Sequence, residues 1–470
     1  MKTIELNNFK KFEHLPEKEL GFINLLVGKC NSGKSSFSQA AISFIDNLLH
    51  IDMNRDEDNL GKLNIFFQSK RPTFHFKCED VELDLGQFND IIHKGGGATE
   101  IILKCGFDFK DGGKKQRVFV SFTIGSHSKD NFGNINKIAI ESYTHKFEFS
   151  FEEDGAFGYC SYLRKDSDTP IIFKSNADDL TDPNEHLLIR VVRNIIRGNE
   201  SEKYELTTED IKIIENLINM LFSVLDQEFN YFGKYEEKRG ITYIPAFYIN
   251  TNYEKEECYD NYKNYKNLDY FRKTLNDFID SKISLNENDE DKYGQFVNKM
   301  MEKFGLGSLI VEDQQCFFVE DKRDCLTPLH LSGKGAIRLI TIILRLAICI
   351  KEKSPLVFIE EPEQNLHPNL QSLLADLLFD AYLLAKRDGQ NINFIVETHS
   401  EYLVRRSQLI VKKCCEVGVE RDSIPFKTFY FPDDGKQPFD MEYNENGSFS
   451  KDFGPGFTDE SAKLAINLIR

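Results

Sequence analysis

The stretch GKCNSGKSS, from Gly28 to Ser36, follows the apolar run FINLLV and precedes FSQAAISFIDNLL, whose apolar residues recur at helical spacing. Gly28, Gly33, Lys34 and Ser35 match the pattern G-x-x-x-x-G-K-[ST] in full. Glycines let backbone N–H groups turn inward around an anion, and the start of the following helix adds positive partial charge at the same place. The stretch therefore predicts a phosphate-binding loop between a strand and a helix, rather than a tight turn formed by chance.

Two side chains of this loop have expected roles. Lys34 would reach the β- and γ-phosphates of a nucleotide, and the Ser35 hydroxyl would bind Mg²⁺. Nucleotide binding is thus the first functional expectation. The process that the nucleotide powers is inferred from the other motifs of the chain.

Composition limits the class of protein. The 470 residues are 40% hydrophobic and 29% charged, which indicates a globular protein with two or three domains. A net charge of -17 argues against a surface that is basic all over and binds nucleic acid, although a local basic groove remains open. The start, MKTIELNNFKKF, has no apolar core, and no run reaches about 18 apolar residues. We expect a cytoplasmic protein without a membrane segment.

The pattern along the chain predicts four segments. Residues 1–64 read as two strands joined by a polar turn, then the loop and its helix. Residues 65–178 form a β-rich lobe, because short alternating strands are separated by Gly and Asn/Asp turns. Residues 179–305 read as a helical insertion that includes a helix capped by Thr208 and another that ends at Gly305. Residues 306–470 return to an α/β pattern.

One stretch of the insertion, TNYEKEECYDNYKNYKNLDYFRK at 251–273, interleaves aromatic and basic residues. Such a mixture can bind single-stranded nucleic acid. Because acidic residues match the basic ones in number, a solvated helical face is the favoured interpretation. No heptad run is long enough for a coiled-coil arm.

The run SPLVFIEEPEQNLHP carries a second candidate group. PLVFI and the later NFIVET are continuous apolar runs typical of buried parallel strands, and the helix between them stops at Gly389. Neighbouring residues of a strand point opposite ways, so Glu360 and Glu361 are expected to do different jobs. Glu360 would face the Mg²⁺ and Glu361 would orient the attacking water. A charged strand end before a turn at Pro362 is the alternative.

Two further groups fit the same chemistry. His399, in VETHSEYLV, comes just after a strand, where it could contact the γ-phosphate and sense its loss, although a lone histidine is more often structural. Ser332, Gly333 and Gly335 stand at the entrance of an apolar helix, which suits a second anion site. Two phosphate cradles in one chain suggest a site shared between two subunits; an ordinary helix cap is the alternative.

These pieces, in this order, resemble an ABC-type ATPase head: GKCNSGKSS as Walker A, LSGKG as the signature motif, LVFIEEPEQNLHP as Walker B with its D-loop, and ETHS as the switch histidine. IELNNFKKF and EEPEQNLHP with ETHSEYLVRR more narrowly resemble the SMC, RecF and OLD-like branch of AAA ATPases, which is common in bacterial anti-phage operons. The likeness covers residues 1–50 and 325–410. It implies an α/β fold, a P-loop NTPase ABC-type head with an antiparallel β lobe and a helical insertion.

The resemblance also implies roles for individual residues. Glu360 would support the metal, Glu361 would be the catalytic base, and Gln87 is a candidate for the glutamine that links the metal to the regulatory lobe. Asn365 to His367 would line a subunit interface. ATP and Mg²⁺ would be held by Gly28, Asn31, Gly33, Lys34, Ser35 and Ser36, and the nucleotide of the opposite subunit would be covered by Ser332, Gly333 and Gly335. LSGKG departs from the commoner LSGGQ, and Lys29, Cys30 and Asn31 replace the usual Pro, Asn and Gly.

The function implied is an ATPase that forms at least a head-to-tail homodimer around ATP and controls a separate effector, a nuclease or toxin, as in the PARIS and Septu systems. A DNA repair or recombination ATPase of the RecF/SMC type is the main alternative. Such a protein would be expected to carry heptad arms or a basic DNA groove, and neither is visible in the sequence. A single-chain OLD nuclease needs more than the about 60 residues that follow the ETHS region. A transporter ATPase would need a membrane-coupling sequence, and none is evident.

Overall fold

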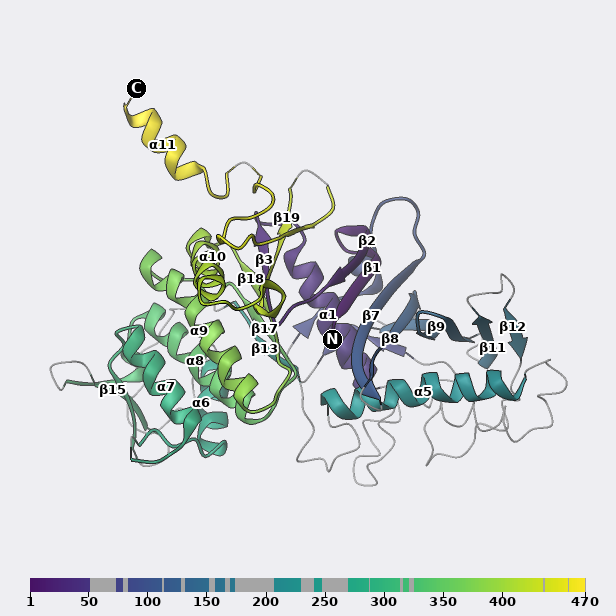
Figure 1. The fold of residues 1–470 in the computed structure, drawn as a ribbon, viewed down its shortest axis with the longest axis horizontal. Coiled ribbons are helices and arrows are strands. Elements are labelled where there is room, and N and C mark those ends of the chain that lie inside the picture. Colours follow the sequence, from purple (N-terminus) through teal and green to yellow (C-terminus); the bar gives the residue numbers. More distant parts are fainter. Residues whose placement is uncertain are drawn as a thin grey trace. The chain divides into compact units, whose positions relative to one another are not determined.

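The computed structural model divides the chain into two compact units, each described by itself here (Figure 1). Unit 1 comprises Met1–Leu20 and Ser35–Ile241, and unit 2 comprises Gly21–Lys34 and Thr242–Arg470. The boundary therefore crosses the chain between Lys34 and Ser35. The structure describes residues 1–50, 73–78, 83–111, 114–127, 132–151, 157–164, 170–173, 207–229, 241–246, 269–286, 288–312, 316–320, 325–433, 436–454 and 456–469.

Unit 1 is built on a nine-stranded sheet in the order β12-β11-β10-β9-β8-β7-β1-β2, with β4 paired to β9. The pairings recorded along this sheet are antiparallel, which confirms the strands predicted from the alternating stretches. A separate pair joins β5 (Lys77–Cys78) and β6 (Leu83–Asp84). The strands of the large sheet are β1 (Thr3–Phe9), β2 (Phe12–Glu19), β4 (Thr73–His75), β7 (Glu100–Asp111), β8 (Lys114–Gly125), β9 (Phe132–Glu141), β10 (His145–Phe151), β11 (Phe157–Arg164) and β12 (Ile171–Phe173).

Strand β2 corrects the polar turn predicted between the first two strands. Phe12 and Leu15 are buried, and the strand pairs with β1 at the edge of the sheet. Pro16 is tolerated in this strand because an edge strand needs no ladder hydrogen bond on its outer side.

The helices of unit 1 are α1 (Lys34–His50), α3 (Phe88–Ile91) and α5 (Thr208–Phe229). The predicted N-cap of α5 was one residue too late, because Thr207 rather than Thr208 caps the helix. The Thr207 hydroxyl accepts from the Asp210 backbone N–H at 3.2 Å, and the Thr207 N–H donates to the Asp210 carboxylate at 2.9 Å. Arg164 of β11 donates to the same carboxylate, so Asp210 also ties the helix to the sheet.

Unit 2 is built on a six-stranded sheet in the order β13-β17-β18-β3-β19-β20. Strands β17, β18, β3 and β19 are parallel, and β20 runs antiparallel to β19. Each residue of β3 and β18 is buried, as the apolar runs predicted. The bounds are β3 (Ile23–Gly28), β13 (Ile241–Ile244), β17 (Leu356–Glu360), β18 (Asn393–Thr398), β19 (Phe426–Phe431) and β20 (Phe439–Met441).

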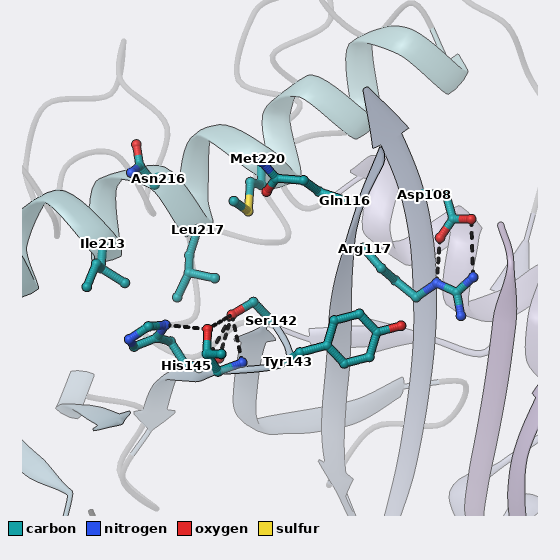
Figure 2. Close-up of a pocket in the computed structure, with 11 residues that line it drawn as sticks. Asp108, Gln116, Arg117, Ser142, Tyr143, His145, Ile213, Asn216, Leu217 and Met220 are labelled. Carbon is teal, nitrogen blue, oxygen red and sulfur yellow. Dashed lines mark hydrogen bonds and ion pairs between the residues drawn. The ribbon is translucent and has the colours of Figure 1, made fainter. Parts of the chain in front are cut away.

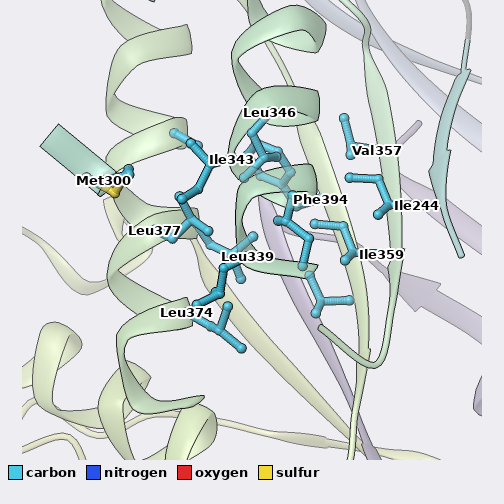
Figure 3. Close-up of a cluster of buried hydrophobic side chains, with 14 of the residues drawn as sticks. Ile244, Met300, Leu339, Ile343, Leu346, Val357, Ile359, Leu374, Leu377 and Phe394 are labelled. Carbon is cyan, nitrogen blue, oxygen red and sulfur yellow. The ribbon is translucent and has the colours of Figure 1, made fainter. Parts of the chain in front are cut away.

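Helices pack on this sheet around one hydrophobic core, which includes Ile343, Leu377 and Phe394 (Figure 3). Helix α8 is buried along nearly its whole length, as its apolar sequence predicted. A small sheet of three strands leads into it. These elements are α6 (Asp269–Asp280), α7 (Lys292–Lys303), β14 (Ser308–Glu312), β15 (Cys316–Glu320), β16 (Leu326–Pro328), η4 (Leu329–Leu331), α8 (Lys334–Lys351), α9 (Pro368–Arg387), α10 (Glu401–Glu416), η5 (Arg421–Ser423) and α11 (Glu460–Ile469).

The helical reading of residues 179–305 needs a correction. Residues 241–244, ITYI, form the edge strand β13 beside β17 instead of a helix, because β-branched and aromatic residues suit a half-buried strand. Helices α5, α6 and α7 lie in the same range, and Gly305 ends α7 at φ 65°. Most of the aromatic and basic stretch 251–273 lies outside the described residues, and only 269–273 are seen, in α6. No helix among the described residues is long and apolar enough to cross a membrane.

Candidate functional site

Four strands of unit 2 end at the same edge of the parallel sheet. Register pairs Thr398 of β18 with Val27 of β3, Phe431 of β19 with Gly28, and Glu360 of β17 with Glu397 of β18. The segments that follow these strands therefore meet at this edge. In open α/β sheets ligands bind outside the carboxyl ends of the strands.

The phosphate loop requires unusual backbone at several positions. A Cβ on Gly28 would lie 2.3 Å from the Phe431 carbonyl oxygen, so only glycine lets β3 approach β19 so closely. Asn31 and Gly33 have φ values of 59° and 109°, which favour asparagine and glycine. These turns curl the loop after β3, as the motif predicted.

Lys34 is buried at the centre of this edge, with 5% of its surface exposed. Its ammonium group donates to the carbonyl oxygens of Gly28 at 3.0 Å and Lys29 at 2.8 Å. Burial lowers the pKa of Lys34, while the nearby carboxylates, Glu397 foremost, raise it. The group is thus a buried cation held by its own loop, ready to exchange neutral carbonyl oxygens for charged phosphate oxygens.

The paired carboxylates of Walker B have separate partners. One Glu360 oxygen accepts from the Ala246 backbone N–H at 3.2 Å, just after β13. Glu361 has φ 39° and its N–H donates to the Glu397 carbonyl at 2.8 Å. Its carboxylate accepts from the Gln364 side chain at 2.6 Å. The two neighbours therefore point to different surroundings, although strand alternation is not the cause, because β17 ends at Glu360 and Glu361 begins the turn that follows.

Arg338 of α8 stands behind the Walker B strand. It is completely buried and donates to the Pro245 carbonyl at 2.7 Å and to the Glu360 carbonyl at 2.6 Å. Burial lowers the pKa of Arg338 to about 10, although Glu363, Glu360 and Glu361 act to raise it. The helix that follows the signature motif is thereby fixed to the strand that carries the carboxylates.

His399 follows β18 at the same edge. Its Nε2 lies 3.6 Å from a Glu361 carboxylate oxygen, and its backbone N–H donates to Glu363 at 2.6 Å. Burial lowers the pKa of His399, Lys34 lowers it further, and Glu361 opposes the shift. The imidazole is therefore neutral at pH 7. Burial also raises the pKa of Glu363.

The signature residues lie beside the turn that follows Walker B. Ser332 ends the η4 turn, and Gly333 is the N-cap of α8. A Cβ on Gly335 would lie 2.6 Å from the Asn365 carbonyl oxygen, so the two segments pack backbone to backbone. The exposed residues of these two segments are Leu331, Gly333, Lys334, Asn365 and His367.

Three predicted residues belong to unit 1. Ser35 and Ser36 follow Lys34 directly in the chain, as the first turn of α1. Gln87 precedes α3, and its N–H donates to the Asp90 carboxylate at 3.1 Å. The assignment of Gln87 to the metal stays a prediction.

Sequence reasoning missed three residues that contact the predicted ones. Glu363 and Gln364 lie in the quoted Walker B stretch, and their spacing from Glu361 in a turn was the available signal. Arg338 lies in the apolar helix that follows Ser332, Gly333 and Gly335, and no role was expected of it. A charged residue in a helix otherwise buried on all sides is itself a signal, because such a charge needs buried partners.

The residues fit a magnesium nucleotide. Glu361, Glu363 and Glu397 all act electrostatically on Lys34, so a triphosphate bound there would face several negative charges. A divalent cation between phosphate and carboxylate would offset that repulsion. Among the described residues no cluster of three His, Cys, Asp or Glu side chains could hold a metal ion alone. In nucleotide sites, Mg²⁺ is commonly held by one or two protein groups together with phosphates and water.

A phosphate loop, paired carboxylates and a histidine at the end of a parallel sheet define a P-loop nucleotide-binding protein. The chain belongs to the AAA ATPase domain family, whose model matches residues 1–404. A comparison with curated proteins found no match.

The chain also matches solved structures of SMC heads. The SMC head domain from Thermotoga maritima has 13% identity and a TM-score of 0.35, with 86% of this chain and 91% of that chain covered. The Smc head domain with an extended coiled coil bound to the C-terminal domain of ScpA, from Pyrococcus furiosus, has 10% identity and a TM-score of 0.38 over 100% and 99%. An SmcHead bound to the C-winged helix domain of ScpA has 12% identity and a TM-score of 0.35 over 94% and 98%.

Proposed function

We propose that the protein binds and hydrolyses ATP, forms a head-to-tail dimer or larger homo-oligomer around it, and thereby controls a separate effector, a nuclease or toxin, in anti-phage defence. The observation that carries the ATPase proposal is the meeting of Lys34, Glu361 and His399 at one sheet edge. The four-part domain division and the cytoplasmic location remain predictions.

The described side chains support particular roles. Lys34 would exchange its two carbonyl acceptors for phosphate oxygens, which strengthens the hydrogen bonds because the acceptor becomes charged. Gly28, Asn31, Gly33, Ser35 and Ser36 would complete the loop around the phosphates. Bound Mg²⁺ would neutralise phosphate charge, with Ser35, Glu360 and Gln87 as its proposed protein neighbours.

Glu361 is the proposed base. Its carboxylate is held by Gln364 and faces His399, so it is oriented toward the γ-phosphate position expected beside Lys34. A carboxylate so placed can accept a hydrogen bond from the attacking water and align it. His399, neutral at pH 7, would contact the γ-phosphate and respond to its release.

The proposal of a dimer rests on the surface of the signature segment, where Leu331, Gly333 and Lys334 are exposed. Ser332, Gly333 and Gly335 offer a helix start with small residues, and Asn365 to His367 lie against it. If the phosphate loop of one subunit holds the nucleotide, this surface is free to cover the nucleotide of another. Nucleotide would then join two heads and hydrolysis would part them, which is the event an effector would sense.

The first experiment compares the wild type with Glu361→Gln for ATP turnover and for mass by light scattering, with and without Mg-ATP. We expect the variant to bind ATP, to hydrolyse it at least about a hundredfold more slowly, and to form a larger species with ATP. A variant that hydrolyses normally would refute the role of Glu361. Failure of both proteins to gain mass with ATP would refute the dimer.

A second arm addresses the partner. Stimulation of turnover by double-stranded DNA would favour a repair or recombination ATPase. Co-purification with the product of a neighbouring nuclease or toxin gene, released from the complex by ATP or by its hydrolysis, would favour effector control.

A further inference from the structure

A cleft of about 600 Å³ lies within unit 1, between α5, the β7–β8 ladder and the turn that joins β9 to β10 (Figure 2). A cavity of this size is in the range of small-molecule sites, about 300–1,000 Å³. None of the residues that line it was given a role above. They are Asp108, Gln116, Arg117, Ser142, Tyr143, Thr144, His145, Ile213, Asn216, Leu217 and Met220.

The cleft has an aromatic wall and an aliphatic wall. Tyr143 has 62% of its surface exposed, yet its ring is held edge-on by Phe119, with centroids 5.6 Å apart and planes at 82°. Leu217 and Met220 of α5 face the turn that carries Tyr143 across the cleft (Figure 2). An exposed ring opposite adaptable aliphatic side chains suits a flat heteroaromatic ring.

Polar groups at the ends of the cleft suit the edge of such a ring. Gln116 and Asn216 each carry an amide, which offers a donor and an acceptor side by side. Arg117 donates to Asp108 at 2.5 and 3.1 Å. The hydrogen bond to Asp108 raises the pKa of Arg117, so this wall carries a fixed ion pair, and Glu19 also lies 3.5 Å from the guanidinium. Amide groups are among those that read base edges in nucleic-acid complexes.

We propose that this cleft binds a nucleotide, with its base between Tyr143 and the aliphatic face of α5. The site is distinct from the phosphate loop and goes beyond ATP hydrolysis. A free nucleotide and a nucleotide within a single strand present the same chemistry, so the experiment separates these two sources.

The chain contains no tryptophan, so Tyr143→Trp introduces a single reporter into the cleft. The reporter is placed in a Lys34→Ala background, which weakens binding at the phosphate loop. Its fluorescence is titrated with AMP, UMP and a ten-nucleotide single-stranded DNA. Tyr402→Trp, at an exposed tyrosine of α10 in unit 2, is the matched control in the same background.

We expect saturable quenching at position 143 and none at 402. By calorimetry in the Lys34→Ala background, Tyr143→Ala should weaken binding about tenfold, while Tyr143→Phe stays within about threefold because the ring is kept. A free nucleotide as the source predicts equal affinity for AMP and the oligonucleotide. A single strand predicts oligonucleotide binding at least about tenfold tighter, with affinity that falls as salt rises.

Three results would overturn the proposal: no quenching at 143 by any probe, equal quenching at 402, or unchanged affinity in Tyr143→Ala. None of them bears on ATP hydrolysis, which is measured with the phosphate loop intact. Tyr143 is exposed, so its replacement is not expected to unfold unit 1.

Discussion

His399 Nε2 lies 3.6 Å from Glu361 Oε1, so the residue proposed to sense the γ-phosphate faces the proposed base directly. The backbone of His399 is also held in place, because the backbone N–H of His399 donates to the buried Glu363 carboxylate. A substitution of His399 should therefore change the surroundings of the Glu361 carboxylate directly.

Replacing His399 by alanine should lower ATP turnover by about tenfold to a hundredfold while ATP affinity changes less than about threefold. The side chain is half-buried and its backbone contact is kept, so the fold should persist. Steady-state kinetics and equilibrium ATP binding together check this. Equal loss of both would assign His399 to nucleotide binding instead.

Acidification should lower turnover through the same pair. Burial lowers the pKa of His399 below its unfolded value of about 6.5. As the pH falls, His399 therefore takes up its proton in the unfolded chain before it does so in the folded protein. The contribution of His399 to the free energy of unfolding is complete above about pH 6.5, and it declines as the pH falls through the pKa of the folded state. Protonated His399 would pair with Glu361, so we expect turnover to fall in this window. A pH–rate profile from pH 5 to 8 measures this fall in turnover. In His399→Gln, the part of the fall that is caused by protonation of His399 should disappear.

Gln364→Ala removes the donor that holds the Glu361 carboxylate at 2.6 Å. We expect turnover to fall about threefold to tenfold, because one hydrogen bond to a charged group contributes about 1.5–3 kcal/mol and its orienting effect is partly replaced by water. Gln408→Ala on α10 is the matched control and should leave turnover unchanged. Normal turnover in Gln364→Ala would mean that Glu361 needs no support from this side chain.

Two glycines of the signature segment should respond differently to alanine. A Cβ on Gly335 would lie 2.6 Å from the Asn365 carbonyl, whereas nothing lies within 4 Å of one on Gly333. Gly335→Ala should lower the free energy of unfolding by about 1–3 kcal/mol, and Gly333→Ala by less than about 0.5 kcal/mol. Urea unfolding of both variants measures this. Equal stability would contradict the close backbone packing of α8 on the Walker B turn.

Arg338→Met would leave the Pro245 and Glu360 carbonyls without their buried donor. Each unsatisfied carbonyl should cost about 1–3 kcal/mol of unfolding free energy. Arg405→Met, an exposed change on α10, should cost less than about 0.5 kcal/mol in the same unfolding assay. Stability equal to that of the control would show that α8 does not depend on this contact.

Much of the candidate site was predictable because its signals are local. The Gly28–Ser35 spacing, the two buried strands before Glu360 and His399, and the glycines at the start of α8 each describe a short stretch of backbone. Periodicity and turn chemistry report such stretches directly, since they depend on residues close in the chain. For the same reason the strands of the β lobe were predicted.

What the chain alone could not reveal is which distant segments become neighbours. Residues 241–244 have side chains that suit a strand, but they form one beside the edge of β17, and residues 12–19 form one beside β1. Glycine at 28 is required by Phe431, about four hundred positions away, and the cleft at Tyr143 exists only because α5 crosses the sheet. Sequence patterns record burial and local conformation, whereas pairing of remote segments depends on the free energy of the whole packed unit.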